Sequence, residues 1–250
     1  MKNILVHIPH SSKRIPPKYR DKFLLSDIGL ADELLKMTDH FIDDLFDVHE
    51  QIVQYNSVSR LVMDPERFRD DRNESMAKVG MGLAYTKTSD GKLLRKLTES
   101  ERDEIARELY DPYHDEFTSK VDAILGRYNS CLIIDAHSFP SEPLPYELKG
   151  DTKSFRADIC LGFDKYHIND DLLKISDEYF SSRHGLSVAH NDPFSGSIVP
   201  SKYYLKDKRV QSLMIEINRS LYMNEQTGQK LPEFPKVREM IQGLFERINR

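Results

Sequence analysis

The sequence predicts a single α/β domain, residues 1–250, in which a mixed, mainly parallel sheet is flanked by helices. Short runs of aliphatic residues with almost no polar alternation are typical of strands buried on both faces. Segments with apolar residues at helical spacing separate these runs, and such alternation is typical of a mainly parallel sheet covered by helices. A length of 250 residues is enough for one large domain with a sizeable core.

The expected strands and helices follow one another along the chain. Strands are expected at Ile4–Ile8, 51–54, Arg60–Met63, 131–134, 158–162, 186–189 and 212–218. Helices are expected at 27–47, 98–127, 169–184 and 235–250, and a proline-containing loop at 141–153. Pro112 should kink or divide the second helix, and Gly185 is a typical residue at a helix end. Residues 68–97 carry charges and few periodic apolar positions, which is typical of a functional lid or binding loop.

Composition and motif searches exclude several classes of protein. The net charge is −5 and the basic residues are scattered, which argues against a nucleic-acid partner. No stretch of about 18 apolar residues is present, so we expect no membrane association. Cys131 and Cys160 each lie in an apolar run and are expected to be buried free thiols of a cytoplasmic protein. A serine-hydrolase elbow and the glycine-rich nucleotide loops are also missing.

Two of the predicted strands each lead into a histidine followed by a serine. Ile4–Ile8 leads into His10 and Ser11, and 131–134 leads into His137 and Ser138. In open α/β sheets, ligands bind outside the carboxyl ends of the strands. Neutral imidazole is the commonest protein ligand of metal ions. Two histidines delivered to that edge from distant parts of the chain could therefore share one metal ion.

A catalytic zinc ion normally has three protein ligands, so a third candidate is needed. Asp39 and Asp43 lie four residues apart on one face of the expected helix, where each could bind the metal, cap the helix or pair with a basic residue. Asp135 lies on the same side of its strand as His137, and could bind the metal or hold a histidine through its second ring nitrogen. His7 alternates away from the strand end and is expected to pack within the sheet.

Charged residues at element ends supply candidates for catalysis and binding. Glu216 interrupts an apolar strand run, and a buried carboxylate is costly unless it is paired. It is either a general base that takes a proton from metal-bound water or part of a buried ion pair with an arginine. Arg60, Arg67 and Arg219 each end an apolar or turn element. The planar guanidinium suits capture of a carboxylate, although each could equally be a surface or ion-pair arginine.

Several segments together resemble the N-formylglutamate amidohydrolase family. They are His7–Ser12, Thr38–Asp39, Ser59–Phe68, Asp135–Pro140, Asp158–Gly162, Pro193–Gly196 and Glu216–Tyr222. They occur in the family's order and span nearly the whole chain. The chain departs from the family pattern at Ser12, where glycine is common. It departs again at 64–67, where Asp-x-Asn-Arg is commoner and Glu66 replaces the Asn.

This resemblance implies a phosphorylase/hydrolase-like fold, related to zinc carboxypeptidases and zinc deacylases. It implies hydrolysis of N-formyl-L-glutamate to formate and L-glutamate, a step of histidine degradation, with Zn²⁺ or another divalent metal as cofactor. The implied metal ligands are His10, Asp39 and His137, the implied catalytic residues are Glu216 and Arg219, and the implied substrate-binding residues are Arg60, Arg67, Ser138 and Asn218.

Two other functions are compatible with these residues. One is deacylation of a different small N-acyl amino acid or a peptide-like amide by the same metal chemistry. The other is ligand binding without catalysis on the same fold. In each case we expect a small-molecule partner bearing carboxylates and a monomer or small homo-oligomer.

Overall fold

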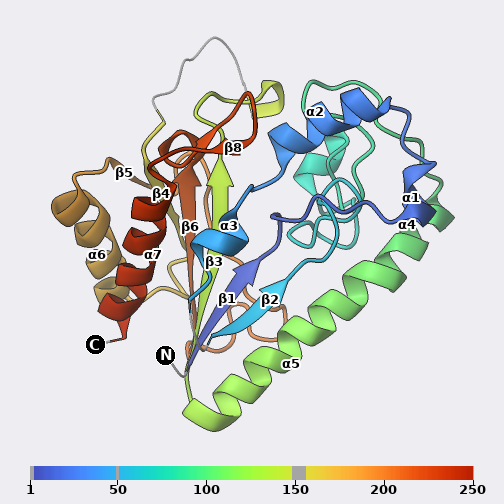
Figure 1. Cartoon of the computed structure of the whole chain (residues 1–250). Helices are drawn as coiled ribbons and strands as arrows, with labels where there is room; N and C mark the ends of the chain where they lie inside the picture. The colour runs from blue at the N-terminus through green and yellow to red at the C-terminus, as the bar shows by residue number, and fades with distance from the viewer. Residues whose placement is uncertain (1–2, 49–50, 148–155, 250) are drawn as a thin grey trace.

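A computed structural model, which describes residues 3–48, 51–147 and 156–249, confirms a mixed and mainly parallel sheet flanked by helices (Figure 1). The sheet strands are β1 (Ile4–Ile8), β2 (Ile52–Tyr55), β3 (Cys131–Phe139), β4 (Ile159–Gly162), β5 (Val188–His190) and β6 (Val210–Asn218). Their order in the sheet is β2-β1-β3-β6-β4-β5. Among these described strands, only the β4–β6 pair is antiparallel.

Helices cover both faces of this sheet. The α-helices of the described residues are α1 (Pro17–Arg20), α2 (Asp27–Met37), α3 (Ile42–Leu45), α4 (Glu99–Ile105), α5 (Asp111–Tyr128), α6 (Asp170–Glu178) and α7 (Phe234–Ile248). α6 and α7 lie on one side of the sheet and the long α5 lies on the other (Figure 1). The helix predicted at 98–127 is divided as expected, because a π-helical turn at Ala106–Tyr110 separates α4 from α5 and Pro112 falls in the first turn of α5. A small hairpin, β7 (Met223–Asn224) with β8 (Gln229–Lys230), precedes α7.

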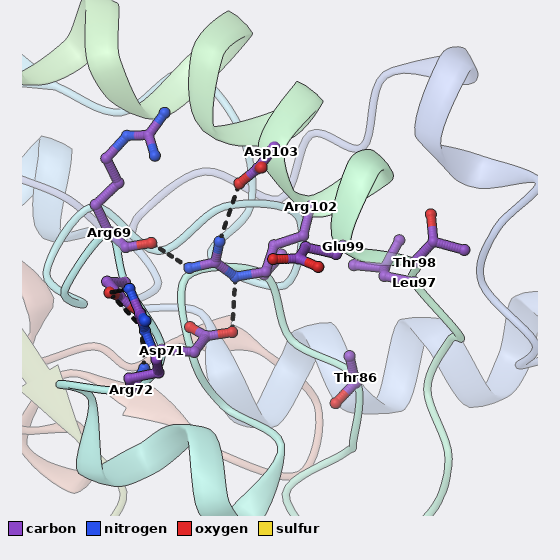
Figure 2. A pocket seen from close by; sticks show the side chains of 11 residues that line it. Arg69, Asp71, Arg72, Thr86, Leu97, Thr98, Glu99, Arg102 and Asp103 are labelled. Atoms are coloured by element: carbon purple, nitrogen blue, oxygen red, sulfur yellow. Dashed lines mark hydrogen bonds and ion pairs between the residues drawn. The ribbon is translucent and has the colours of Figure 1, made fainter.

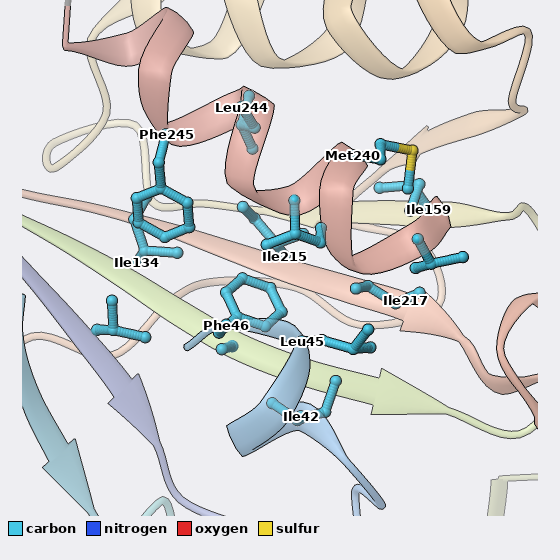
Figure 3. Close-up of a cluster of buried hydrophobic side chains, with 14 of the residues drawn as sticks. Ile42, Leu45, Phe46, Ile134, Ile159, Ile215, Ile217, Met240, Leu244 and Phe245 are labelled. Atoms are coloured by element: carbon cyan, nitrogen blue, oxygen red, sulfur yellow. The ribbon is translucent and has the colours of Figure 1, made fainter. Parts of the chain in front are cut away.

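The two faces of the central strands differ in chemistry. On one face Ile134 and Ile215 pack with Ile42 and Phe46, next to α3, and with Phe245 of α7 (Figure 3). Because successive side chains of a strand point to opposite faces, the alternate positions of the same strands project toward the α5 side. Those positions include the polar residues His7, Asp135, His137 and Glu216. Strand alternation alone therefore gathers these polar groups on one face.

The long segment between β2 and α4 has a hydrophobic core of its own. It packs against α1, α2 and the end of α4 around the residues Leu61, Val62, Met63, Leu83, Tyr85 and Leu94. The strand predicted at Arg60–Met63 is wrong, because these residues form a turn in which the N–H groups of Val62 and Met63 donate to the carbonyl of Ser59. The carbonyls of Leu61 and Val62 accept hydrogen bonds from the buried guanidinium of Arg95, whereas in a strand they would bond a neighbouring strand.

The helix predicted at 27–47 is interrupted. α2 ends at Met37, Thr38 is extended, and Phe41 has a left-handed backbone with φ of 64°. At the break the backbone N–H of Asp39 donates to the carbonyl of His10, which takes Asp39 out of the helix. Asp39 and Asp43 therefore do not share a helix face, and Asp39 is buried whereas Asp43 is exposed.

Other expectations can be compared with the described residues. Cys131 and Cys160 are buried free thiols, as predicted. No helix in the described ranges has the length and apolar character needed to cross a membrane. Residues 148–153 of the predicted loop and Arg250 of the predicted last helix lie outside the described residues.

Candidate active site

A cavity of about 460 Å³ lies where β1, β3 and β6 end. Most residues that the sequence singled out meet there: His10, Asp39, Arg60, Arg67, His137, Ser138, Glu216 and Arg219. β3 carries His137 and Ser138, β6 carries Glu216, and the chain just after β1 carries His10. The break between α2 and α3 brings in Asp39. Residues from distant parts of the sequence thus converge because parallel strands end at one edge of the sheet.

Three side chains form a compact triad of potential metal ligands: His10, Asp39 and His137. Asp39 Oδ2 lies 3.2 Å from His137 Nδ1 and 3.7 Å from His10 Nδ1. The two imidazole rings have centroids 5.1 Å apart. All three residues are buried, and each offers a nitrogen or oxygen atom to the same point.

The far nitrogen of each triad histidine is held by a buried carboxylate. His10 Nε2 donates to Asp64 Oδ1 over 2.8 Å, and His137 Nε2 donates to Asp135 Oδ1 over 2.9 Å. Both Nδ1 atoms are left facing Asp39. A carboxylate behind each imidazole is the usual support of metal-ligating histidines. Of the two roles considered for Asp135, the hydrogen bond to a histidine is the one that the structure shows.

The triad fits a divalent cation. His10 Nδ1 is buried and has no hydrogen-bond partner among the described residues, which is unusual for an imidazole nitrogen. Two imidazole nitrogens and a carboxylate oxygen are a donor set that zinc accepts. The carboxyl groups around the two histidines are those of Asp39, Asp64, Glu66, Asp135 and Glu216, whereas the guanidinium groups are those of Arg60, Arg67 and Arg219. A divalent cation bound among these carboxyl groups would take the place of protons on the ligand side chains.

Charged neighbours shift the pKa values of the triad in opposite directions. Burial alone would raise the pKa of Asp39, but the two histidines and Arg219 hold it well below its usual range. Burial alone would favour neutral His137, yet the carboxylates of Glu66 and Asp135 raise its pKa well above its usual value. The centre therefore attracts positive charge.

Glu216 lies beside the triad in the middle of the sheet. It is paired in register with His137 of β3, and its side chain is buried. Its Oε2 atom has no hydrogen-bond partner, and Glu216 forms no ion pair with an arginine among the described residues. Burial raises its pKa to about 8, with Asp39 and Glu66 adding to the rise and His137 opposing it. A carboxyl group with this pKa can hold or release a proton near neutral pH.

The structure places Arg219 behind the site. Its Nε donates to Ser138 Oγ over 3.1 Å, and its Nη1 donates to the carbonyl of Lys36 over 2.6 Å. Its Nη2 donates to Asp39 Oδ1 over 2.9 Å and faces the carbonyl of Ser138. These contacts occupy nearly all donors of the guanidinium. Arg219 therefore holds Asp39 in place, and its predicted direct role on substrate or oxyanion stays a prediction.

Arg60 and Arg67 flank Asp64 on the cavity wall. Arg60 Nη2 donates to Asp64 Oδ2 over 3.0 Å, and Arg67 Nη2 lies 3.7 Å from the same oxygen. The Nε atoms bond Tyr85 Oη and the Met81 carbonyl. Within the described part of the chain these contacts leave Nη1 of each arginine for another partner. Both guanidinium groups can thus present one edge to an anion in the cavity.

Asn218 is the one predicted site residue that the structure keeps out of the cavity lining. Its side chain caps the turn that follows β6, where Oδ1 accepts from the N–H and the hydroxyl of Ser220. Its amide nitrogen donates to the carbonyl of Ala157. These local bonds use both ends of the amide, so the structure shows Asn218 holding the turn, and its substrate-binding role stays a prediction.

Sequence reasoning missed two carboxylates at the site. Asp64 joins His10 to Arg60 and Arg67, and its position between two arginines in the chain was an available signal. Glu66 Oε1 lies 3.2 Å from His137 Nε2, and its side chain is 17% exposed to the cavity. Its only signal was the departure from the family pattern at that position.

A second cavity, of about 570 Å³, lies between residues 69–72 and the start of α4. Figure 2 shows the guanidinium of Arg102 pointing to Asp71, Asp103 and the backbone carbonyl of Arg69. Arg72 pairs with Asp70 in the same way. Since these charges are paired with one another and the cavity holds none of the predicted site residues, we do not assign it a function.

Comparisons with known proteins agree on one family. A family model described as N-formylglutamate amidohydrolase matches residues 2–223. N-formylglutamate deformylase of Pseudomonas putida is 26% identical over 231 residues, which are 89% of this chain and 82% of that protein.

Two solved structures share the fold. An N-formylglutamate amidohydrolase from Ralstonia eutropha JMP134 superposes with a TM-score of 0.84 at 24% identity, covering 98% of this chain and 92% of that one. The gene product Atu2144 from Agrobacterium tumefaciens superposes with a TM-score of 0.64 at 21% identity, covering 100% of this chain and 92% of that one.

Proposed function

Since this chain belongs to the N-formylglutamate amidohydrolase family, we propose that it is a zinc-dependent enzyme that hydrolyses N-formyl-L-glutamate to formate and L-glutamate. The observation that carries the proposal is the triad of His10, Asp39 and His137, with the unpartnered Glu216 Oε2 beside it. A metal-ligand set and a free carboxyl group in one cavity are the parts that metal-assisted amide hydrolysis requires.

The residues of the triad would hold the ion, and the remaining residues have separate tasks. A zinc ion bound there would supply Lewis-acid activation of water and of the amide carbonyl. Glu216 would take a proton at Oε2 and return it to the leaving amine nitrogen. Arg60 and Arg67 would hold a substrate carboxylate through their Nη1 edges and so orient the amide bond. Arg219 would keep Asp39 oriented toward the two histidines.

The test is the variant Glu216→Gln, measured with N-formyl-L-glutamate as substrate. We expect kcat to fall by about two orders of magnitude or more, as is typical when a general base is lost, while metal content and thermal stability stay close to wild type. Glu33→Gln is the matched control, because Glu33 is also a buried glutamate but bonds Ser89 away from the cavity.

Several outcomes would contradict the proposal. Full turnover by Glu216→Gln would show that Glu216 is not the general base. Turnover of N-acetyl-L-glutamate or N-formyl-L-methionine at much higher kcat/KM than N-formyl-L-glutamate would shift the activity to another N-acyl amino acid. Specific binding of N-formyl-L-glutamate without any hydrolysis would indicate a non-catalytic relative.

A further inference from the structure

A line of buried side chains runs from the triad to helix α5. Tyr113 Oη lies 2.7 Å from His7 Nε2, and His7 Nδ1 lies 2.7 Å from Asp135 Oδ1. The same Asp135 oxygen lies 2.9 Å from His137 Nε2. All four side chains are buried. The ring of His7 also stacks on Phe117 of α5, with centroids 4.9 Å apart and planes inclined by 23°. His7 therefore has no freedom to change its orientation.

The hydrogen positions in this line follow from what each group can donate. A carboxylate only accepts, so both nitrogens that face Asp135 Oδ1 must carry hydrogen. The other oxygen of Asp135 accepts from the backbone N–H of Ile198. With hydrogen on Nδ1, His7 can accept at Nε2 from the Tyr113 hydroxyl. Burial raises the pKa of Tyr113 well above its usual value, so this hydroxyl keeps its hydrogen.

This arrangement has a consequence for the metal ligand. With hydrogen held on Nε2 of His137, it is Nδ1 that faces Asp39, 3.2 Å from Oδ2, and a metal ion bound beside Asp39 would take the place of the proton on that Nδ1. We propose that His7 and Tyr113 are positioning residues that, through Asp135, hold His137 in the Nε2–H form with Nδ1 presented to the metal. The proposal rests on the metal dependence in the proposed function, but not on the identity of the substrate.

The same residues could instead hold a second metal ion, because atoms of His7, Glu66, Asp135 and His137 lie within 4.8 Å of one another. Hydrogen-bond satisfaction favours the positioning role. Both nitrogens of His7 and both oxygens of Asp135 have partners, whereas His10 Nδ1 in the triad has none among the described residues. The buried nitrogen without a hydrogen-bond partner, His10 Nδ1, belongs to the triad and not to this cluster, so the triad is the better metal site.

The test compares two variants of His7 in the full chain. His7→Asn keeps an N–H donor near the position of Nδ1, and His7→Leu removes it. We expect His7→Leu to weaken zinc affinity by about 10- to 100-fold, as is typical for loss of a residue that supports a metal ligand. His7→Asn should restore most of that affinity, and Tyr113→Phe should weaken it only a few-fold. The readouts are the zinc Kd by competition with a chromogenic chelator and the zinc content per chain.

His167→Asn is the matched control. His167 is also fully buried with both ring nitrogens bonded, to the carbonyl of Val210 and the N–H of Leu205, but it lies outside the cavity lining. This variant should lower the thermal stability and leave the zinc Kd unchanged. A purely structural role of His7 would give that same pattern for His7→Leu.

The outcomes separate the possibilities. Unchanged zinc affinity in His7→Leu, or equal losses in the Asn and Leu variants, would overturn the positioning role. Two zinc ions per wild-type chain, with one lost in His7→Leu, would establish a second metal site instead. If His7→Leu does not fold, wild-type affinity in Tyr113→Phe would overturn the proposal. Tight zinc binding without hydrolysis of N-formyl-L-glutamate would overturn the proposed substrate alone, whereas no zinc binding by wild type would overturn both.

Discussion

Arg219 shows how the role of one residue depends on where its hydrogen bonds go. The guanidinium contacts Asp39, Ser138 and the carbonyl of Lys36, and the residue is only 3% exposed. Because its N–H groups already donate to acceptors within the protein, Arg219 has few donors available for a substrate carboxylate. We therefore propose that it contributes to the site by orienting Asp39, a proposed metal ligand.

The variant Arg219→Lys tests this assignment. Lysine keeps the positive charge but cannot reach three separate acceptors with a planar fork. We expect zinc affinity to fall by about 10- to 100-fold because Asp39 loses its anchor. KM measured at saturating zinc should change little. A raised KM with unchanged zinc affinity would restore the direct substrate-binding role.

We expect His114 to make the stability of the fold sensitive to mild acid. Its Nε2 bonds the carbonyl of Pro65, and burial lowers its pKa to about 4 from an ordinary 6.5. Between these two values the unfolded chain binds a proton that the folded protein does not. The stabilising contribution of neutral His114 is therefore complete above pH 6.5 and is lost as the pH falls toward 4.

Replacing His114 by Gln should reduce this acid sensitivity. Glutamine can keep the hydrogen bond to Pro65 but does not titrate. Between pH 7 and pH 5 the variant should lose about 2 kcal/mol less stability than wild type. Urea unfolding of both proteins at the two pH values measures the difference. Parallel losses in both proteins would show that His114 does not contribute.

At the scale of elements, the break between α2 and α3 places Asp39, the proposed third metal ligand, beside the two histidines. The apolar spacing over 27–47 suits one helix, and only the hydrogen bond from Asp39 to the carbonyl of His10 shows why the helix stops. A helix continuing through residue 39 would have used that N–H inside the helix. The same contact brings two members of the triad together.

A single buried residue, Arg95, organises the segment between β2 and α4. Its Nε donates to the carbonyl of Tyr85 over 2.7 Å, and its Nη2 donates to the carbonyls of Leu61 and Val62 over 2.7 and 2.8 Å. These bonds hold the turn that begins at Arg60 against the rest of the hydrophobic cluster. Arg60, the proposed substrate-binding arginine, is thus positioned by a turn and not by a strand.

Arg95→Met should damage both stability and binding. The variant leaves three buried carbonyls without a donor, and each unsatisfied group costs about 1–3 kcal/mol. We expect the free energy of unfolding to fall by about 3 kcal/mol or more, and KM to rise because the Arg60 turn loosens. Denaturant unfolding and steady-state kinetics measure these effects. Lys96→Met, at the exposed neighbouring position, should change neither, and a similar loss there would contradict the assignment.

At the scale of the whole molecule, the proposed metal links the two halves of the fold. His137 lies in β3 and His10 directly after β1, whereas Asp39 lies at the break between α2, which packs with the segment between β2 and α4, and α3, which packs against the sheet. An ion bound to all three would stabilise the folded state alone, because the unfolded chain does not preserve this arrangement.

Removal of the metal should therefore lower both activity and stability. After chelation we expect hydrolysis to cease and the Tm to fall. Zinc at about 100 times its Kd should restore about 2.7 kcal/mol of stability together with the activity. Differential scanning calorimetry and activity assays on the same samples measure both. Full activity in protein verified to be free of metal would contradict the proposed mechanism.

The sequence predicted most of the fold because its strands are short apolar runs, whose burial on both faces is visible in their composition. It failed at Arg60–Met63, where an apolar run forms a turn stabilised by a distant arginine. The pattern at the strand ends also placed His10, His137 and Glu216 at one edge of the sheet. Those three residues lie in or directly after strands, where position along the chain predicts position in space.

By itself, the sequence determined that an α/β sheet would bring two histidines and a buried glutamate to the same edge, because parallel strands and side-chain alternation leave little choice. Only the tertiary structure decided that Asp39 and not Asp43 lies beside them, and that Arg219 bonds Asp39. It also revealed Asp64, which holds His10. These roles depend on a helix break and on hydrogen bonds between residues distant in the chain, which local sequence patterns do not encode.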